Sequence, residues 1–304
     1  MDDILVLGSE FTTGANLAAG LADQTRVSAR PLVVPTHLSD EEQDAYSTTV
    51  AVEIARDVIA ASGASQIIYC GAAAESCWAR TELTSDDANT LRIWLRAAHD
   101  ESVRLTFVSS DAVFTGPRLF HEENSPNRCT SREARLIVEM EDLVRRVLPE
   151  SLIVRTHAYG WSPDGNGYVE TLVDDLSRGR TEHLDAVRHA TPILATDLAD
   201  MIARAIEEEL TGTLHLGGAE RCSFADFART LADVFQLPAP EITPGPTLTT
   251  RAAGFGAGET GLNSKRVRNL LNLALPMVDE GLVRLAGQRA EAASTEPVRE
   301  LIAA

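Results

Sequence analysis

The chain has 304 residues, of which 44% are hydrophobic and 24% charged, and its formal net charge is −18. This composition excludes a disordered chain, and the negative charge opposes binding to nucleic acid or to an anionic membrane surface. Because no apolar run approaches the roughly 18 residues needed to span a bilayer, we expect neither a nucleic-acid nor a membrane partner.

The cysteines carry the information on compartment and metals. Cys70, Cys77, Cys129 and Cys222 form no Cys-x-x-Cys pair and no metal-ligand spacing. In a long chain with an acidic start and no signal-type apolar segment, such cysteines are typical of reduced thiols in the cytoplasm. We therefore expect a cytoplasmic protein without a metal, in which Cys77 and Cys129 are buried, unreactive thiols.

Short apolar runs alternate with helical patterns through the first half of the chain. Strands are predicted at Ile4–Leu7, Val27–Ala29 with Leu32–Val34, Gln66–Cys70, Arg104–Ser110 and Ser151–Thr156, and helices at Ala45–Ser62, Asp86–His99 and Ser131–Val147. Each parallel crossover needs a helix to bring the chain back. The pattern therefore predicts an α/β fold with a doubly wound parallel sheet. Ligands bind such sheets at the carboxyl ends of the strands, where Gly8, Gly71–Ala74, Ser109–Asp111 and Thr156–Tyr159 should converge.

The second half has a different texture. The turn-rich stretch "GWSPDGNGY" follows Tyr159, and helices at Tyr168–Arg178 and Ala195–Leu210 and a strand at Thr213–Gly218 come after it. We predict a sheet domain of residues 1–158 and 190–218, and a smaller α/β lobe of residues 159–189 and 219–304.

The stretch "ILVLGSEFTTGANLAAGL" is a strand, a glycine-bounded turn and a helix start, which is the outline of a dinucleotide-binding loop. Gly8 and Gly14 bound the turn. Between them lie Glu10 and Phe11, where a phosphate-binding turn favours small, uncharged residues. The sequence therefore raises the question of whether a dinucleotide still binds.

The segments "CGAAA", "VSSDAVFTG", "FHEENSPN", "VRTHAYGW", "GTLHLGG" and "GLNSKRV" follow this turn in order. From Ile4 to about Leu285 the chain resembles the extended short-chain dehydrogenase/reductases, and within them the dTDP-4-dehydrorhamnose reductases, which reduce a 4-keto nucleotide sugar with NAD(P)H. The resemblance implies a Rossmann-type dinucleotide-binding domain, a substrate-binding lobe, NAD or NADP as cofactor, and a nucleotide-sugar-like ligand.

The residues that match the family's cofactor site are mixed in character. Gly8 and Gly14 match the first and last glycines of its turn, but Phe11 stands at the middle one, where a ring crowds the pyrophosphate, and Glu10 adds a like charge. The resemblance places Ala72, Ala73 and Ser109 beside the cofactor and Arg30 at the 2′-phosphate of NADP. Close packing explains the two alanines equally well, and a solvated surface position explains Arg30.

The catalytic positions depart from the family further. Ser110 matches the family's Ser or Thr, and Asn89 matches a helix asparagine of its proton path, although a buried hydrogen bond between helices would also explain Asn89. No tyrosine lies between Tyr69 and Tyr159, and the chain has a single lysine, Lys265, so no Tyr-x-x-x-Lys motif exists.

Alignment puts Ser131 and Arg135 where the family has its catalytic tyrosine and lysine. Serine is a poor proton donor, and arginine stays charged in the useful range. His157, after a strand, is the candidate substitute acid or base; a hydrogen-bonded wall residue is the alternative.

Three functions stay open at this point. The first is a binding or regulatory subunit of the nucleotide-sugar reductase type whose hydride-transfer chemistry is lost or rewired. The second is an active NAD(P)H-dependent ketoreductase or epimerase with a non-standard acid, and the third is a cofactor-free isomerase or lyase in the same pocket. The partner is a nucleotide-sugar-like small molecule or a protein, and a homodimer is compatible with the acidic surface.

Overall fold

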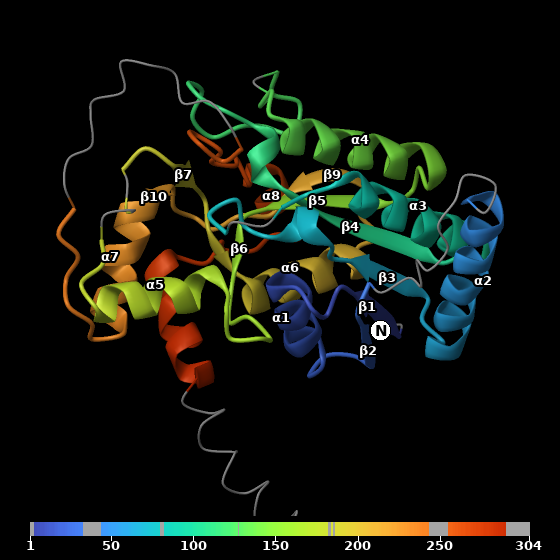
Figure 1. Ribbon diagram of the computed structural model, residues 1–304, viewed down its shortest axis with the longest axis horizontal. Coiled ribbons are helices and arrows are strands. Elements are labelled where there is room, and N and C mark those ends of the chain that lie inside the picture. The colour runs from blue at the N-terminus through green and yellow to red at the C-terminus, as the bar shows by residue number, and fades with distance from the viewer. Residues whose placement is uncertain are drawn as a thin grey trace, which may run out of the picture.

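The computed structural model describes residues 3–32, 44–79, 82–126, 128–181, 184, 186–242 and 255–289. Its centre is a sheet of six strands in the order β2-β1-β3-β4-β5-β9 (Figure 1). Every neighbouring pair is parallel. The strands are β1 (Ile4–Leu7), β2 (Val27–Arg30), β3 (Gln66–Tyr69), β4 (Arg104–Ser110), β5 (Leu152–Thr156) and β9 (Gly212–His215). The predicted doubly wound parallel sheet is confirmed.

Helices cover both faces of this sheet. One layer contains α1 (Thr12–Leu21) and α6 (Ala195–Glu207), and the other contains α2 (Asp44–Ser62), α3 (Ser85–Asp100) and α4 (Arg132–Val147). Successive side chains of a strand point to opposite faces. Accordingly Ile4 and Val6 belong to the core under α1 and α6, whereas Leu5 and Leu7 belong to the core under α2, α3 and α4.

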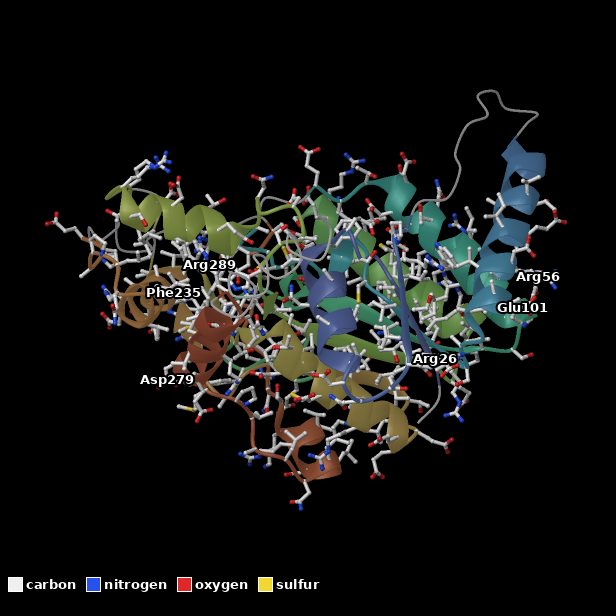
Figure 2. The ribbon with its side chains drawn as sticks, turned by 90° about the horizontal axis from the view of Figure 1, so that it is seen from below. Arg26, Arg56, Glu101, Phe235, Asp279 and Arg289 are labelled. Atoms are coloured by element: carbon white, nitrogen blue, oxygen red, sulfur yellow. The ribbon has the colours of Figure 1, made fainter. Side chains whose placement is uncertain are left out.

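At the edge of the second layer an ion pair ties α2 to the end of α3. Arg56 Nε lies 2.7 Å from a carboxylate oxygen of Glu101 (Figure 2). Both side chains are partly exposed, so the pair adds little free energy beyond the apolar packing of the two helices.

The smaller lobe has its own apolar core. It contains α5 (Tyr168–Ser177), α7 (Phe224–Val234) and a helix at residues 278–289. Two short ladders join it to the sheet domain: β6 (Ala158–Tyr159) pairs with β8 (Ile193–Leu194), and β7 (His189–Ala190) pairs with β10 (Cys222–Ser223). Figure 2 labels Phe235 and Arg289 in this lobe, where both side chains contact Trp161. The predicted residue limits of the two domains stay a prediction.

Several boundaries differ from those predicted. β2 ends at Arg30, so Leu32 is not in a strand, and residues 33 and 34 lie outside the described residues. β9 ends at His215: Leu216 still donates its N–H to the carbonyl of Arg155 on β5, but the next N–H on that side, of Gly218, bonds the carbonyl of Thr191 instead. α6 ends at Glu207, just before Glu209 takes the left-handed conformation with φ of 50°. The ladders of β6, β7, β8 and β10 were not predicted, since two residues carry no readable period.

One short helix completes the description. The helix α8 (Lys265–Leu271) packs beside β9. No helix among the described residues combines the length and the apolar character needed to cross a bilayer.

The strand order reverses next to β1. β1 pairs with β2 on one side and with β3 on the other, so the order of the strands reverses between β1 and β3. The loops after these two strands therefore meet at the point where doubly wound folds bind ligands.

Candidate functional site

The turn between β1 and α1 keeps the glycines that a tight strand-to-helix connection needs. Gly8 has a φ of +96°, and a Cβ placed on it would lie 1.8 Å from the carbonyl oxygen of Cys70. A Cβ on Gly14 would lie 2.1 Å from the carbonyl oxygen of Gly8. Both positions therefore require glycine for packing of the turn itself, whether or not a phosphate binds there.

Phe11 stands at the N-cap of α1 and makes no side-chain capping hydrogen bond. Its ring packs against the core under α2, α3 and α4 and also lines the large cavity described below. Glu10, beside it, accepts a hydrogen bond from the backbone N–H of Leu32, just beyond β2, at 2.9 Å. The loop residues are thus engaged with the protein's own core and backbone.

Glu75, which follows β3, places its carboxylate at the start of α1. Its Oε1 accepts the backbone N–H of Thr13 at 2.9 Å, while Thr13 Oγ1 donates to the carbonyl of Ala74. Burial raises the pKa of Glu75, and hydrogen bonds from Thr13 and Thr12 act in the opposite direction. The first N–H groups of a helix are a ready anion site. Here a carboxylate of the chain itself takes that site.

The other residues matched to the cofactor site have different surroundings. Ala72 and Ala73 are buried in the short helix η1 (Ala72–Ala74) after β3. Ser109 is fully buried and donates to Glu141 Oε1 at 2.8 Å. Arg30 is exposed and lines a separate apolar cavity of 180 Å³ together with Trp94. The cofactor roles assigned to these residues stay predictions.

The residues matched to the catalytic positions differ in burial and in hydrogen bonding. Ser110 is buried and accepts the N–H of Ala112 at 3.0 Å, and Ser131 caps α4 by accepting the N–H of Ala134 at 3.1 Å. Arg135 is exposed on α4, and Asn89 is exposed on α3, where it accepts a hydrogen bond from Arg92. Their catalytic roles stay untested predictions.

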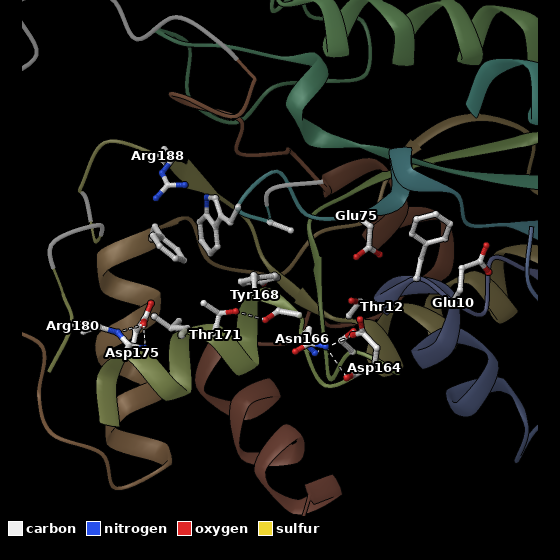
Figure 3. Close-up of a pocket in the computed structure, with 17 residues that line it drawn as sticks. Glu10, Thr12, Glu75, Asp164, Asn166, Tyr168, Thr171, Asp175, Arg180 and Arg188 are labelled. Carbon is white, nitrogen blue, oxygen red and sulfur yellow. Dashed lines mark hydrogen bonds and ion pairs between the residues drawn. The ribbon is translucent and has the colours of Figure 1, made fainter. Parts of the chain in front are cut away.

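A cavity of 730 Å³ runs from the start of α1 to the smaller lobe (Figure 3). Glu10, Phe11, Thr12 and Glu75 line one end. Arg180 and Arg188 line the other end, where Arg180 is paired with Asp175 at 2.6 Å and the Arg188 guanidinium lies 4.6 Å from the centre of the Phe224 ring. The wall between them includes Trp78, Tyr168, Asp164, Asn166 and Thr171. The cavity is therefore acidic beside α1 and carries its cations in the lobe.

His157 lies behind the cavity wall, in a fully buried cluster. Its Nε2 is 2.8 Å from Ser76 Oγ, and its Nδ1 is 3.0 Å from Asp111 Oδ2. Thr260 donates to Asp111 Oδ2 at 2.5 Å, and Cys77 Sγ is 3.7 Å from Asp111 Oδ1. The Trp78 ring, 4.3 Å from His157 between centres, separates the imidazole from the cavity. The role of His157 as an acid or base stays an untested prediction.

The sequence analysis did not identify several residues that line the cavity or contact His157. Glu75, Ser76 and Trp78 follow β3, and Tyr168 begins α5. The Tyr168 hydroxyl is buried and has no hydrogen-bond partner among the described residues. The only available signal was position, because the loops after β3, β4 and β5 were expected to converge. Which side chains in those loops face each other depends on backbone geometry that no pattern encodes.

Comparison with known proteins places the chain. The family model described as RmlD substrate binding domain matches residues 2–287. The chain belongs to the RmlD substrate binding domain family. The resemblance predicted from the sequence motifs is thereby confirmed at the level of the family. No curated protein matched the chain in sequence.

Solved structures share the fold of this RmlD-family chain. A dTDP-4-dehydrorhamnose reductase from Clostridium acetobutylicum has a TM-score of 0.72 at 20% identity, over 95% of this chain and 99% of that chain. The Bacillus anthracis reductase, solved in complex with NADP, has a TM-score of 0.74 at 18% identity, over 94% and 98%. A UDP-glucose 4-epimerase from Thermotoga maritima, solved with UDP-glucose, has a TM-score of 0.70 at 14% identity, over 96% and 99%.

Proposed function

We propose that this chain does not hold a dinucleotide pyrophosphate at the start of α1, and that it acts as a binding or regulatory subunit for a nucleotide-sugar-like ligand without hydride transfer. The observation that carries this proposal is the hydrogen bond from the Thr13 N–H to Glu75 Oε1 at 2.9 Å. A phosphate needs the same backbone groups, and they are already satisfied by an anion of the protein.

Electrostatics makes this competition costly for a dinucleotide. A pyrophosphate oxygen about 4 Å from the Glu75 carboxylate would raise the free energy of binding by about 4 kcal/mol at an effective dielectric constant of 20. That corresponds to roughly a thousandfold loss of affinity. The Phe11 ring, packed against the core, also lines the space beside the turn. NAD and NADP, which the family implies, therefore fit this loop poorly.

The residues at the positions of the family's proton donor are altered as well. Ser131 is engaged in capping α4, and Arg135 points to solvent, so neither lines the large cavity. His157 is buried behind Trp78. General acid catalysis requires a donor within hydrogen-bond reach of the substrate. This arrangement supports a loss of reduction more than a replacement of the acid.

The lobe end of the cavity supports a nucleotide-sugar-like ligand. A volume of 730 Å³ lies within the range of small-molecule sites. Arg188 offers positive charge for a diphosphate at a distance from Glu75, whereas Arg180 is already paired with Asp174 and Asp175. The rings of Trp78 and Phe224 offer apolar faces for a sugar or a base.

Calorimetry with the full chain tests both halves of the proposal. We expect no heat of binding with NADH or NADPH at concentrations where UDP-glucose or dTDP-glucose binds. Arg188→Gln should weaken the nucleotide sugar by about tenfold, since a charge-assisted hydrogen bond contributes on the order of 1.5 kcal/mol. Micromolar binding of NADPH to the wild type would overturn the lost-cofactor half. Failure of every nucleotide sugar to bind would overturn the ligand half.

A substitution of Glu75 tests the first part of the proposal, that no dinucleotide pyrophosphate binds at the start of α1. Glu75→Gln keeps a carbonyl acceptor for Thr13 and removes the charge, so NADPH affinity should rise at least tenfold. Glu170→Gln is the matched control, because Glu170 is also a partly buried carboxylate that accepts a backbone N–H, at 2.6 Å, but the N–H belongs to Ser162 and not to α1. Equal responses of the two variants to NADPH would contradict the assigned role of Glu75.

A further inference from the structure

The buried cluster behind Trp78 brings three different metal-ligating side chains together. Cys77 follows β3, Asp111 follows β4 and His157 follows β5, so neighbouring parallel strands deliver one group each. One ligand atom of each lies within 4.8 Å of the other two. No spacing along the chain indicated this, because 34 residues separate Cys77 from Asp111 and 46 separate Asp111 from His157.

The distances suit a tetrahedral ion. Sγ of Cys77 is 3.7 Å from Asp111 Oδ1 and 3.8 Å from His157 Nδ1, and Nδ1 is 3.0 Å from Asp111 Oδ2. Zinc bonds of about 2.3 Å to sulfur and 2.0 Å to nitrogen or oxygen, at tetrahedral angles, separate neighbouring ligand atoms by about 3.3 to 3.6 Å. Shifts of a few tenths of an ångström would convert the cluster into three corners of such a site.

The charges also balance. Asp111 and His157 are 0% exposed and Cys77 is 7% exposed, and the ion pair that Asp111 makes among the described residues is with His157. A buried carboxylate without a full positive charge beside it is unfavourable. One thiolate, one carboxylate and a neutral imidazole carry a charge of −2 in total, which a divalent cation cancels.

The surroundings resemble the outer shell of a metal site. Ser76 Oγ holds the second ring nitrogen of His157 at 2.8 Å, and Thr260 donates to Asp111 Oδ2 at 2.5 Å. Such contacts fix the orientation of ligating side chains.

We propose that Cys77, Asp111 and His157 bind one divalent thiophilic cation, of which Zn²⁺ is the natural candidate. A thiolate and an imidazole select Zn²⁺ over Mg²⁺ or Ca²⁺. The fourth position is left to water or another small ligand. The site joins the carboxyl ends of three strands behind the cavity wall, and none of its three side chains lines the cavity of the ligand proposed above.

Cobalt is the probe that reports on the ligands directly. The untagged full chain, stripped with a chelator, should bind one equivalent of Co²⁺ and show the near-ultraviolet absorption of a thiolate–cobalt bond. Zn²⁺ should displace that band and raise the melting temperature. If the wild type binds no Co²⁺, or binds it without the thiolate band, the proposal is overturned.

Substitutions test which side chains bind the metal. Cys77→Ser and Asp111→Asn should weaken Co²⁺ binding at least a hundredfold. Ser76→Ala, which removes the hydroxyl that contacts His157 and also accepts the Trp78 N–H, should weaken it by about tenfold. Cys222→Ser is the matched control, because it removes a thiol that lies on β10. Asp111→Asn preserves shape and hydrogen bonding, so it is informative if Cys77→Ser does not fold. A thiolate band that persists in Cys77→Ser would overturn the assignment.

Discussion

Two carboxylates that leave bulk water, Glu141 and Glu75, are stabilised in different ways. Glu141 is 0% exposed on α4 and accepts Arg155 Nε at 2.7 Å and Arg155 Nη2 at 2.6 Å. Burial acts to raise the pKa of Glu141, but the hydrogen bonds and charge of Arg155 outweigh it and lower that pKa. Within the described part of the chain Glu75 has no such cation, and burial raises its pKa.

Glu141 and Glu75 differ in how far their negative charge is compensated. A guanidinium paired with two carboxylate oxygens cancels the charge of Glu141 inside the core, between β4, β5 and α4. Among the described residues, Glu75 is held at the wall of the cavity by the N–H groups and hydroxyls of Thr12 and Thr13, and these helix N–H groups carry only partial positive charge. An anion that is only partly compensated, at the point where a ligand phosphate would bind, acts on ligand choice more than on folding.

The largest expected effect follows from breaking the compensated pair. Glu141→Gln leaves the Arg155 guanidinium, with a side chain 2% exposed, without its counter-ion. Removing one partner of a buried pair costs about 3 to 5 kcal/mol of unfolding free energy. Urea unfolding at neutral pH measures this loss.

The neighbour on the same helix supplies the control. Asp142, whose side chain is 51% exposed, pairs with Arg145 on the surface. Asp142→Asn should change the unfolding free energy by no more than about 0.5 kcal/mol. Similar losses in both variants would show that the Glu141 pair is not the compensated core interaction that its geometry implies.

The pH dependence of the two sites should have opposite signs. The pKa of Glu75 is raised in the folded chain above the roughly 4.3 of an unfolded glutamate, so its favourable contribution exists below that pH and is lost as the pH rises through the folded pKa. Glu75→Gln should therefore gain stability relative to the wild type from about pH 4 upward, and this gain should level off once the pH exceeds the folded pKa of Glu75.

Glu141 gives the reverse profile. Its folded pKa is lowered, so its stabilisation is complete above about pH 4.3 and disappears as the pH falls through the folded pKa. Urea unfolding of both variants and the wild type across this range measures the two profiles. A flat difference for Glu75→Gln would contradict the raised pKa and weaken the case for an uncompensated anion beside α1.

Much of the fold was predictable because its signals are local. The apolar runs at β1 and β4 matched the strands residue for residue, and the stripe on α4 gave that helix to within one residue. The ladders of β6 and β7 were not predictable, since two-residue strands are set by which backbones meet in three dimensions.

The site was predictable only in its location. The expected convergence of loops after β3, β4 and β5 correctly brought Asp111 and His157 into one region. Glu75 was missed, because a carboxylate in a loop has no sequence pattern that distinguishes a solvated group from one aimed at a helix start. Cys77 was placed among buried thiols, and its contacts with Asp111 and His157 depend on tertiary geometry alone.

Apart from the Asp142→Asn control, the smallest loss of stability is expected for Arg145, the outer partner of Glu141. Arg145 also contacts Glu141, at 3.0 Å, but its side chain is 39% exposed, so water and salt screen its charge. Arg145→Gln should cost about 0.5 to 1 kcal/mol in unfolding free energy at low salt and less at 0.5 M salt. Arg155, being buried, keeps most of the compensation in either case. A salt-insensitive loss as large as that of Glu141→Gln would mean that the outer guanidinium, and not the inner one, holds the carboxylate.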